Sequence, residues 1–247
     1  MSVEATIIAR VEVRGAIYEL VALWEDYRLQ VVGGTIGAIS TLEICIIPSL
    51  MNNASVWVGI TEKQYKELDN FQYELVRALL QVPGSTPLAC LRAATGMMAM
   101  KWRVWEQKLL LVLDIQGQED TVLAKLVFEE QVSLGLPELT SEVSDICLSI
   151  RLPDICSTDC VTKQEIRECI LYNHLQSLKE ELATIEKGSE LAVMDIREPQ
   201  EYLTNTSLAE ARMAFRVRYI GRMGCMACLK GKEEGGTGLF RGLAALP

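Results

Sequence analysis

The chain has 247 residues, of which 49% are hydrophobic and 23% are charged, and its formal net charge is −9 at pH 7. This composition excludes a disordered chain, and the length allows one or two globular domains with a buried core. The acidic balance argues against a wholly basic nucleic-acid binder, although it is compatible with a local basic surface.

The first residues and the cysteines predict where the protein is found. No basic segment followed by an apolar run begins the chain, so no secretory signal is predicted. Eight cysteines are scattered along the sequence, and several lie within helical patterns, where cysteine behaves as a small apolar residue. We therefore expect an intracellular protein, cytoplasmic or nuclear and not secreted, with reduced thiols.

Helical periodicity dominates the first fifty residues. Residues 2–30 are predicted as helix with an interruption near Gly15, although the alternation over residues 11–14 also fits a short strand. Residues 36–50 form an almost wholly apolar helix, which is typical of the centre of a bundle. Residues 29–51 contain one charge, Glu43, but their polar residues and glycines favour a buried helix over a membrane span.

The middle of the chain is predicted to contain three helices separated by two tight breaks. Thr61 and Gln64 match a capping box, in which each side chain pairs with the other residue's backbone N–H, so they open the first helix. That helix runs to about Val82, where Pro83 and the following Gly84 stop it.

The second helix of this stretch is short and the third is long. Thr86 is the predicted cap of the second helix, with Pro87 at its first position and Gly96 at its end. The third helix begins near Met98 and ends at Gly117. Its apolar residues recur at steps of four and three, which predicts one buried face formed by Met98, Trp102, Trp105, Leu109 and Val112.

A basic island accompanies the third helix, whose cations lie off the apolar stripe. Residues 71–113 hold two acidic and five basic residues, the latter being Arg77, Arg92, Lys101, Arg103 and Lys108. Because lysine and arginine supply most phosphate contacts, such an island in an acidic protein could follow a polyanion. On spacing alone, a solvated helix face is the simpler interpretation.

Three helices are predicted next. Residues 122–132 and 138–151 are helical, and each segment ends at a proline-containing break. Thr162 then caps a long helix that runs to Ile185. Its predicted buried stripe is Ile166, Ile170, Leu171, Leu175, Leu178 and Leu182.

The end of the chain combines a helix, a basic segment and a glycine-rich tail. Ser207 and Glu210 match a second capping box, which opens a last helix. Residues 212–232 contain six basic and no acidic residues, namely Arg212, Arg216, Arg218, Arg222, Lys230 and Lys232. Residues 235–247 are rich in glycine and show no regular pattern.

Few groups suited to catalysis are present. The only histidine, His174, lies in mid-helix and is expected to be a surface residue, and no glycine-rich phosphate loop is found. Cys225 and Cys228 form a C-x-x-C pair, which is half of a structural zinc site whose second half is missing. No cofactor is therefore predicted, apart from an incomplete zinc site.

Together these patterns predict an all-α protein, an irregular multi-helix bundle with a glycine-rich C-terminal tail. The expected division is a helical bundle over residues 1–117, a helical extension over 118–221, and a half cysteine motif with a disordered tail over 222–247.

Four segments in order resemble a known family. They read VGGTIGAISTLEICIIPSLMNNASVWV, LDNFQYELVRALLQVPGSTPLACLRAATGMMAMKWRVWEQKLLLVLDI, DTVLAKLVFEEQ and LGLPELTSEV. This series resembles the region that follows the polymerase palm in reverse transcriptases of non-LTR retrotransposons. The resemblance covers residues 2–230 and implies the thumb and its C-terminal extension, followed by a cysteine/histidine element whose first half is CMAC.

The resemblance implies a fragment that is catalytically inactive alone. The fingers, the palm with its magnesium-binding aspartates, and the endonuclease would all be missing from it. In the family the thumb holds the template–primer duplex, so the expected partners are RNA or an RNA–DNA duplex and the missing palm. The phosphate-contact candidates are Arg77, Arg92, Lys101, Arg103, Lys108, Arg212, Arg216, Arg218 and Arg222.

Helices that pack on a palm expose apolar surface when alone, so self-association is also expected. The alternative function is a helical interaction or scaffold protein without a nucleic-acid role. The arrangement of the basic residues discriminates between the two. One shared concave face favours the thumb, whereas dispersal among glutamates favours the scaffold. An independent enzyme is the third and weakest interpretation, because catalytic groups are lacking.

Overall fold

The computed structural model describes residues 37–216, with gaps at 38, 41–42, 45–46, 136–138, 157–160, 186–195, 197–198 and 205–207. The predicted helix over residues 2–30, the cysteine pair Cys225 and Cys228, and the glycine-rich tail lie outside the described residues. So do Arg218 and Arg222.

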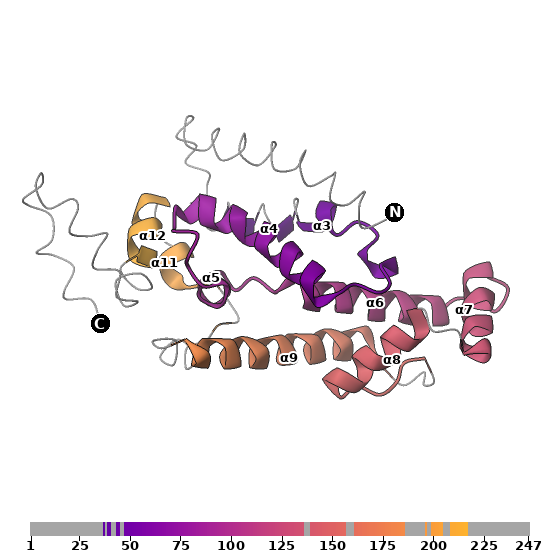
Figure 1. Ribbon diagram of the computed structural model, residues 1–247. Helices are drawn as coiled ribbons and strands as arrows, with labels where there is room; N and C mark the ends of the chain where they lie inside the picture. The colour runs from indigo at the N-terminus through magenta and orange to yellow at the C-terminus, as the bar shows by residue number, and fades with distance from the viewer. Residues whose placement is uncertain are drawn as a thin grey trace, which may run out of the picture.

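Every regular element of the described residues is a helix, which confirms the predicted all-α fold (Figure 1). In chain order they are α3 (Ile47–Leu50), the 3₁₀ helix η2 (Ala54–Val56), α4 (Glu62–Leu80), α5 (Leu88–Thr95), α6 (Met100–Gln116), α7 (Leu123–Leu134), α8 (Leu139–Ile150), α9 (Lys163–Thr184), α11 (Glu201–Thr204) and α12 (Leu208–Phe215).

Two helices begin with the predicted capping geometry. At α4 the Thr61 N–H donates to Gln64 Oε1 over 2.8 Å, and the Gln64 N–H donates to Thr61 Oγ1. Thr162 and Glu165 form the same reciprocal pair at the start of α9. Each box satisfies two N–H groups that have no partner within the helix, which fixes where these helices start.

The start of α5 differs from its prediction. Pro87 is the N-cap rather than the first helical residue, and no side chain caps this helix. Thr86 instead belongs to the preceding turn, where its N–H donates to the Pro83 carbonyl over 3.0 Å. The end agrees with the prediction, because Gly96 has φ 69°, a left-handed conformation that glycine adopts without steric cost.

Two apolar clusters form the core, and α6 contributes to both. Met100 and Val104, in its first half, pack with α3, α4, α5, α11 and α12. Leu109 and Val112, in its second half, pack with Phe128 of α7, with α8 and with the first half of α9. The second half of α9 joins the first cluster, so α6 and α9 lie antiparallel, side by side (Figure 1).

The buried faces of α6 and α9 differ from prediction. Met98, Trp102 and Trp105 were expected to be buried but are half-buried, whereas Met100 and Val104, outside the predicted stripe, are buried. Leu171 was expected in the stripe of α9 but is 39% exposed, and His174, expected at the surface, is 4% exposed. Lys108 was expected off the apolar stripe of α6 and is completely buried. Helix α6 is contacted from several sides, so its buried surface is wider than the stripe that periodicity marks.

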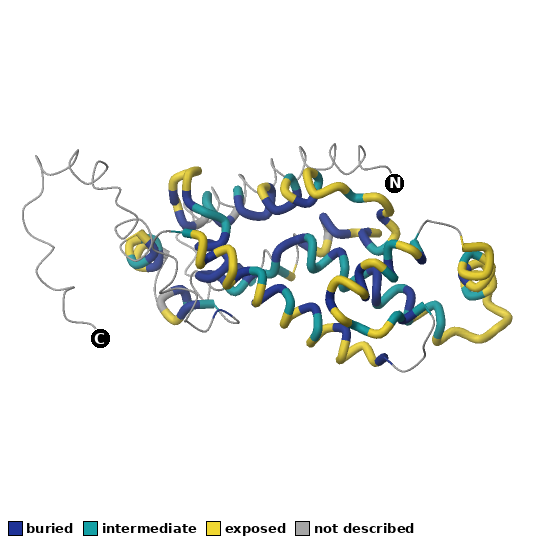
Figure 2. Tube along the Cα trace, turned by 60° about the horizontal axis from the view of Figure 1, so that its bottom comes forward, coloured by how far each residue is buried: buried dark blue, intermediate teal, exposed yellow. Residues whose placement is uncertain are grey.

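Helix α7 is packed differently from its neighbours. It lies across one end of the molecule, and most of its surface is exposed (Figures 1 and 2). Phe128 is its only buried residue. Among the described residues, no helix is both long enough and apolar enough to cross a membrane.

Candidate nucleic-acid interface

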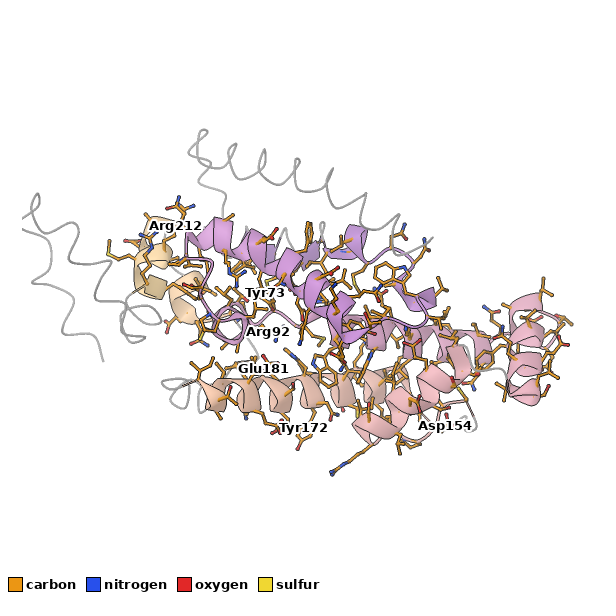
Figure 3. The ribbon with its side chains drawn as sticks, viewed as in Figure 1. Tyr73, Arg92, Asp154, Tyr172, Glu181 and Arg212 are labelled. Carbon is orange, nitrogen blue, oxygen red and sulfur yellow. The ribbon has the colours of Figure 1, made fainter. Side chains whose placement is uncertain are left out.

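Arg92 is the centre of a buried charged network. Its Nη2 lies 2.9 Å from Asp69 Oδ2, its Nη1 lies 2.9 Å from Glu181 Oε2, and its Nε donates to the Tyr73 hydroxyl over 3.1 Å. These partners come from α4 and α9, and Figure 3 shows Tyr73, Arg92 and Glu181 in line between the two helices. The network therefore connects α4, α5 and α9, and Arg92 is only 5% exposed.

The pKa values of Asp69 in this network and of the nearby His174 are shifted from their ordinary ranges. Burial raises the pKa of the Asp69 carboxyl, although Arg92 and the Met100 N–H, which donates to it over 2.8 Å, act in the opposite direction. Burial lowers the pKa of the nearby His174 to about 4, and the charges of Arg92 and Arg103 add to this effect. His174 is thus neutral at pH 7 and lies beside Trp102.

The three cations of α6 are all paired with carboxylates. Lys101 Nζ lies 2.6 Å from Glu62 Oε1 and 4.8 Å from the centre of the Trp105 ring. Arg103 Nη2 lies 2.6 Å from Glu43, and Lys108 Nζ lies 2.5 Å from Glu142. Burial lowers the pKa of Lys108, and Glu142 opposes that shift.

This pairing sorts four of the five candidates of the basic island by how accessible they are to a phosphate. Arg92 and Lys108 are buried, so a phosphate cannot reach either group in this structure. Lys101 and Arg103 keep part of their side chains at the surface, but each would have to leave a carboxylate to bind a phosphate. Trp102 and Trp105 are half-buried and contact each other edge to face, with ring centres 5.1 Å apart.

A second group of arginines lies at the other end of the molecule from α7. Arg77 is in the last turn of α4, and its Nη2 donates to the Thr86 carbonyl over 3.0 Å. The exposed Arg216 donates from Nη2 to the Gln81 carbonyl over 2.7 Å, directly after the same helix. Arg212 lies on α12 (Figure 3), one turn before Arg216, which directly follows that helix. We call Arg77, Arg212 and Arg216 the arginine end.

Sequence reasoning missed the acidic partners of the cations. Asp69, Glu142 and Glu181 were not among the candidate residues, and neither was the tyrosine of the Arg92 network. A signal for Asp69 does exist, because it lies four residues after Tyr65 and four before Tyr73, on the buried face of α4. Glu142 and Glu181 meet their cations only through tertiary packing.

No cluster of three or more potential metal ligands occurs within the described part of the chain. The half zinc site at Cys225 and Cys228 lies outside that part. The described thiols of Cys90, Cys147, Cys156 and Cys169 are free, and burial raises the pKa of each of them. Such thiols are poor nucleophiles at neutral pH.

Comparisons of this chain with protein-family models, with curated proteins and with solved structures find no match.

Proposed function

We propose that this chain is a non-catalytic, thumb-like helical module of the type found in retrotransposon RNA-directed DNA polymerases, and that it binds an RNA–DNA duplex through its arginine end. The proposal combines the sequence resemblance with one observation that supports this choice of surface. Arg77 and Arg216 pair with backbone carbonyls, whereas the cations of α6 pair with carboxylates.

The kind of partner decides whether a lysine or arginine keeps a net positive charge that can attract a polyanion. A guanidinium that donates to a carbonyl keeps its positive charge and has further N–H donors, whereas an ion pair is neutral as a unit. Arg216 is exposed, so a phosphate can approach it without breaking a buried contact. Four more basic residues follow Arg216 in the sequence up to residue 232.

Matched charge reversals test this location. Arg216→Glu should weaken binding of a short RNA–DNA hybrid and reduce the slope of log affinity against log salt by about one. Lys101→Glu is the control on α6, and its effect on binding should be small. Lys108→Glu is unsuitable, because it would bury a second carboxylate beside Glu142.

Arg216 also caps the C-terminal end of α4, so the unfolding temperature of each variant must be measured with its affinity. A folded wild-type protein that shows no binding at low salt would overturn the proposal. A larger loss with Lys101→Glu than with Arg216→Glu would return the interface to α6.

The second candidate function is a helical interaction or scaffold protein without a nucleic-acid role. The ion pairs of α6 favour it, because cations dispersed among glutamates form no positive face. Absence of salt-dependent duplex binding, together with a stable fold, is the result that this candidate predicts.

A further inference from the structure

Helix α7 carries an apolar face that no described residue covers. Leu123 is 74% exposed, Leu126 47%, Val127 44% and Leu134 63%. These positions fall on one side of the helix, opposite the buried Phe128. Figure 2 shows this helix as an almost continuous exposed segment at the end of the molecule.

The inner side of α7 is also loosely packed. A cavity of about 610 Å³ lies between the end of α6 and α7, and it is lined by Leu113, Gln116, Phe128, Val132 and Cys156 among others. The buried Oε1 of Gln116 has no hydrogen-bond partner there. The helix therefore gains little from the core of its own chain, although its apolar content would suit a buried helix.

Charge indicates what kind of surface covers this face. Glu130 lies in the middle of it, between Val127 and Leu134 at steps of three and four, and the adjacent Glu129 is also exposed. Two α7 helices packed face to face would bring the Glu130 carboxylates of both copies into the seam, where like charges repel. A partner with an apolar centre and positive charge fits better.

The arginine end of this same protein, together with the exposed apolar residues of α12 beside it, has that chemistry. Ala209 and Met213 on α12 and Arg216 directly after it are exposed and recur at steps of four and three, so they share one face. Met213 is 52% exposed, and methionine adapts its shape to irregular apolar surfaces. Because α7 and α12 lie at opposite ends of the molecule, they can meet only between two copies (Figure 1).

We propose that the exposed face of α7 binds the arginine end of a second copy of this chain, with Met213 against Leu126 and Val127 and Arg216 beside Glu130. The contact joins two different surfaces, so the two copies associate head to tail. Each dimer therefore keeps one unoccupied α7 face and one unoccupied arginine end, to which further copies can add. It does not rest on duplex binding, although both would use Arg216.

The test is the concentration dependence of the molecular mass of the full chain, measured by light scattering or sedimentation. The wild-type mass should rise beyond a dimer. Leu126→Glu and Met213→Glu should each weaken self-association roughly tenfold or more, because each buries a charge in the apolar contact. Leu148→Glu is the control, since Leu148 is 79% exposed on α8 outside both surfaces.

Mixing the two variants distinguishes this contact from every symmetric one. Leu126→Glu keeps an intact arginine end and Met213→Glu keeps an intact α7, so an equimolar mixture should form a one-to-one dimer that does not grow. Leu123→Glu replaces Leu126→Glu if that variant is not folded. A wild-type chain that stays monomeric, a Met213→Glu chain that self-associates as strongly as wild type, or a mixture without dimer would overturn the proposal.

Discussion

Helices α6 and α7 follow each other in the chain, and they use their side chains in opposite ways. Helix α6 carries three cations and is nevertheless packed from several sides, with Lys108 completely buried beside Glu142. Helix α7 carries mostly apolar residues and buries only Phe128. The contrast teaches that burial in this protein follows from tertiary partners, because the more polar of the two helices is the more buried.

The two helices also differ in whether their side chains are already paired within the molecule. The cations of α6 are paired with carboxylates of the same molecule, whereas the apolar face of α7 remains exposed. The sequence pattern of each helix taken alone would predict the opposite, with the cations of α6 facing solvent and the apolar residues of α7 buried. Changes that leave a buried charge of α6 without its partner should therefore be costly, and changes on the outer face of α7 should cost little.

The largest effect is expected where the charged network is broken. Arg92→Met leaves the Asp69 carboxylate buried with only the Met100 N–H as a partner, so it should lower the free energy of unfolding by about 3–5 kcal/mol. Urea titration measures this change. The double variant Arg92→Met with Asp69→Leu should recover part of the loss, and a single variant within 1 kcal/mol of wild type, on the order of an exposed pair, would contradict a structural role.

A matched pair of truncations compares the two helices directly. Leu109→Ala on α6 removes a completely buried side chain and should cost about 2–5 kcal/mol. Leu123→Ala on α7 removes one that is 74% exposed and should change stability by about 0.5 kcal/mol or less. Both are measured by urea unfolding at a concentration at which the chain is monomeric. Equal losses would show that α7 is as tightly packed as α6.

Stability should also depend on pH through His174. Burial lowers its pKa from the ordinary value of 6.5 to about 4, so the unfolded chain takes up a proton at a pH where the folded chain does not. Stability is therefore complete above pH 6.5 and decreases as the pH falls toward 4, by roughly 3 kcal/mol at 1.4 kcal/mol per pH unit.

The variant His174→Gln isolates this effect. The raised pKa of Asp69 acts in the opposite direction, because stability from that group decreases as the pH rises above 3.8. Subtracting the profile of His174→Gln from that of wild type removes the Asp69 contribution. Parallel profiles between pH 6.5 and 4 would contradict the burial of His174.

Among the charged pairs, the smallest effect is expected at Lys101. Its partner Glu62 has a side chain that is 68% exposed, so Lys101→Ala should cost about 1 kcal/mol or less, including the contact with Trp105. Added salt should reduce the difference further. Glu142→Ala is the contrasting variant, because it leaves the buried Lys108 without its carboxylate and should cost several times more.

Local chemistry explains which parts of the fold were predictable. The capping boxes at Thr61 and Thr162 and the left-handed Gly96 involve residues at most three or four positions apart, so the sequence alone contains the whole interaction. Periodicity likewise located five of the six buried residues of α9, but only Leu109 and Val112 among the five buried residues of α6. The start of α5 was missed because Thr86 could serve either a turn or a cap, and both are local.

The charged residues could not be placed in this way. Whether Lys108 faces solvent or the core depends on α8, which supplies Glu142 from 34 residues further along the chain. His174 is buried because α6 packs against it, which no spacing within α9 indicates. For the candidate interface, the sequence therefore supplied the basic residues, and only the structure supplied the carboxylates that neutralise some of them.

The Arg92 network has a consequence for how this protein is made. Glu181 is 89 residues beyond Arg92, so a ribosome adding about 5–20 residues per second completes α9 several seconds after α5. During that interval the guanidinium of Arg92 and the apolar side of α6 that α9 later covers have no partner from α9. The nascent chain should therefore depend on chaperones at this stage, and the whole core should form only after α9 has left the ribosome.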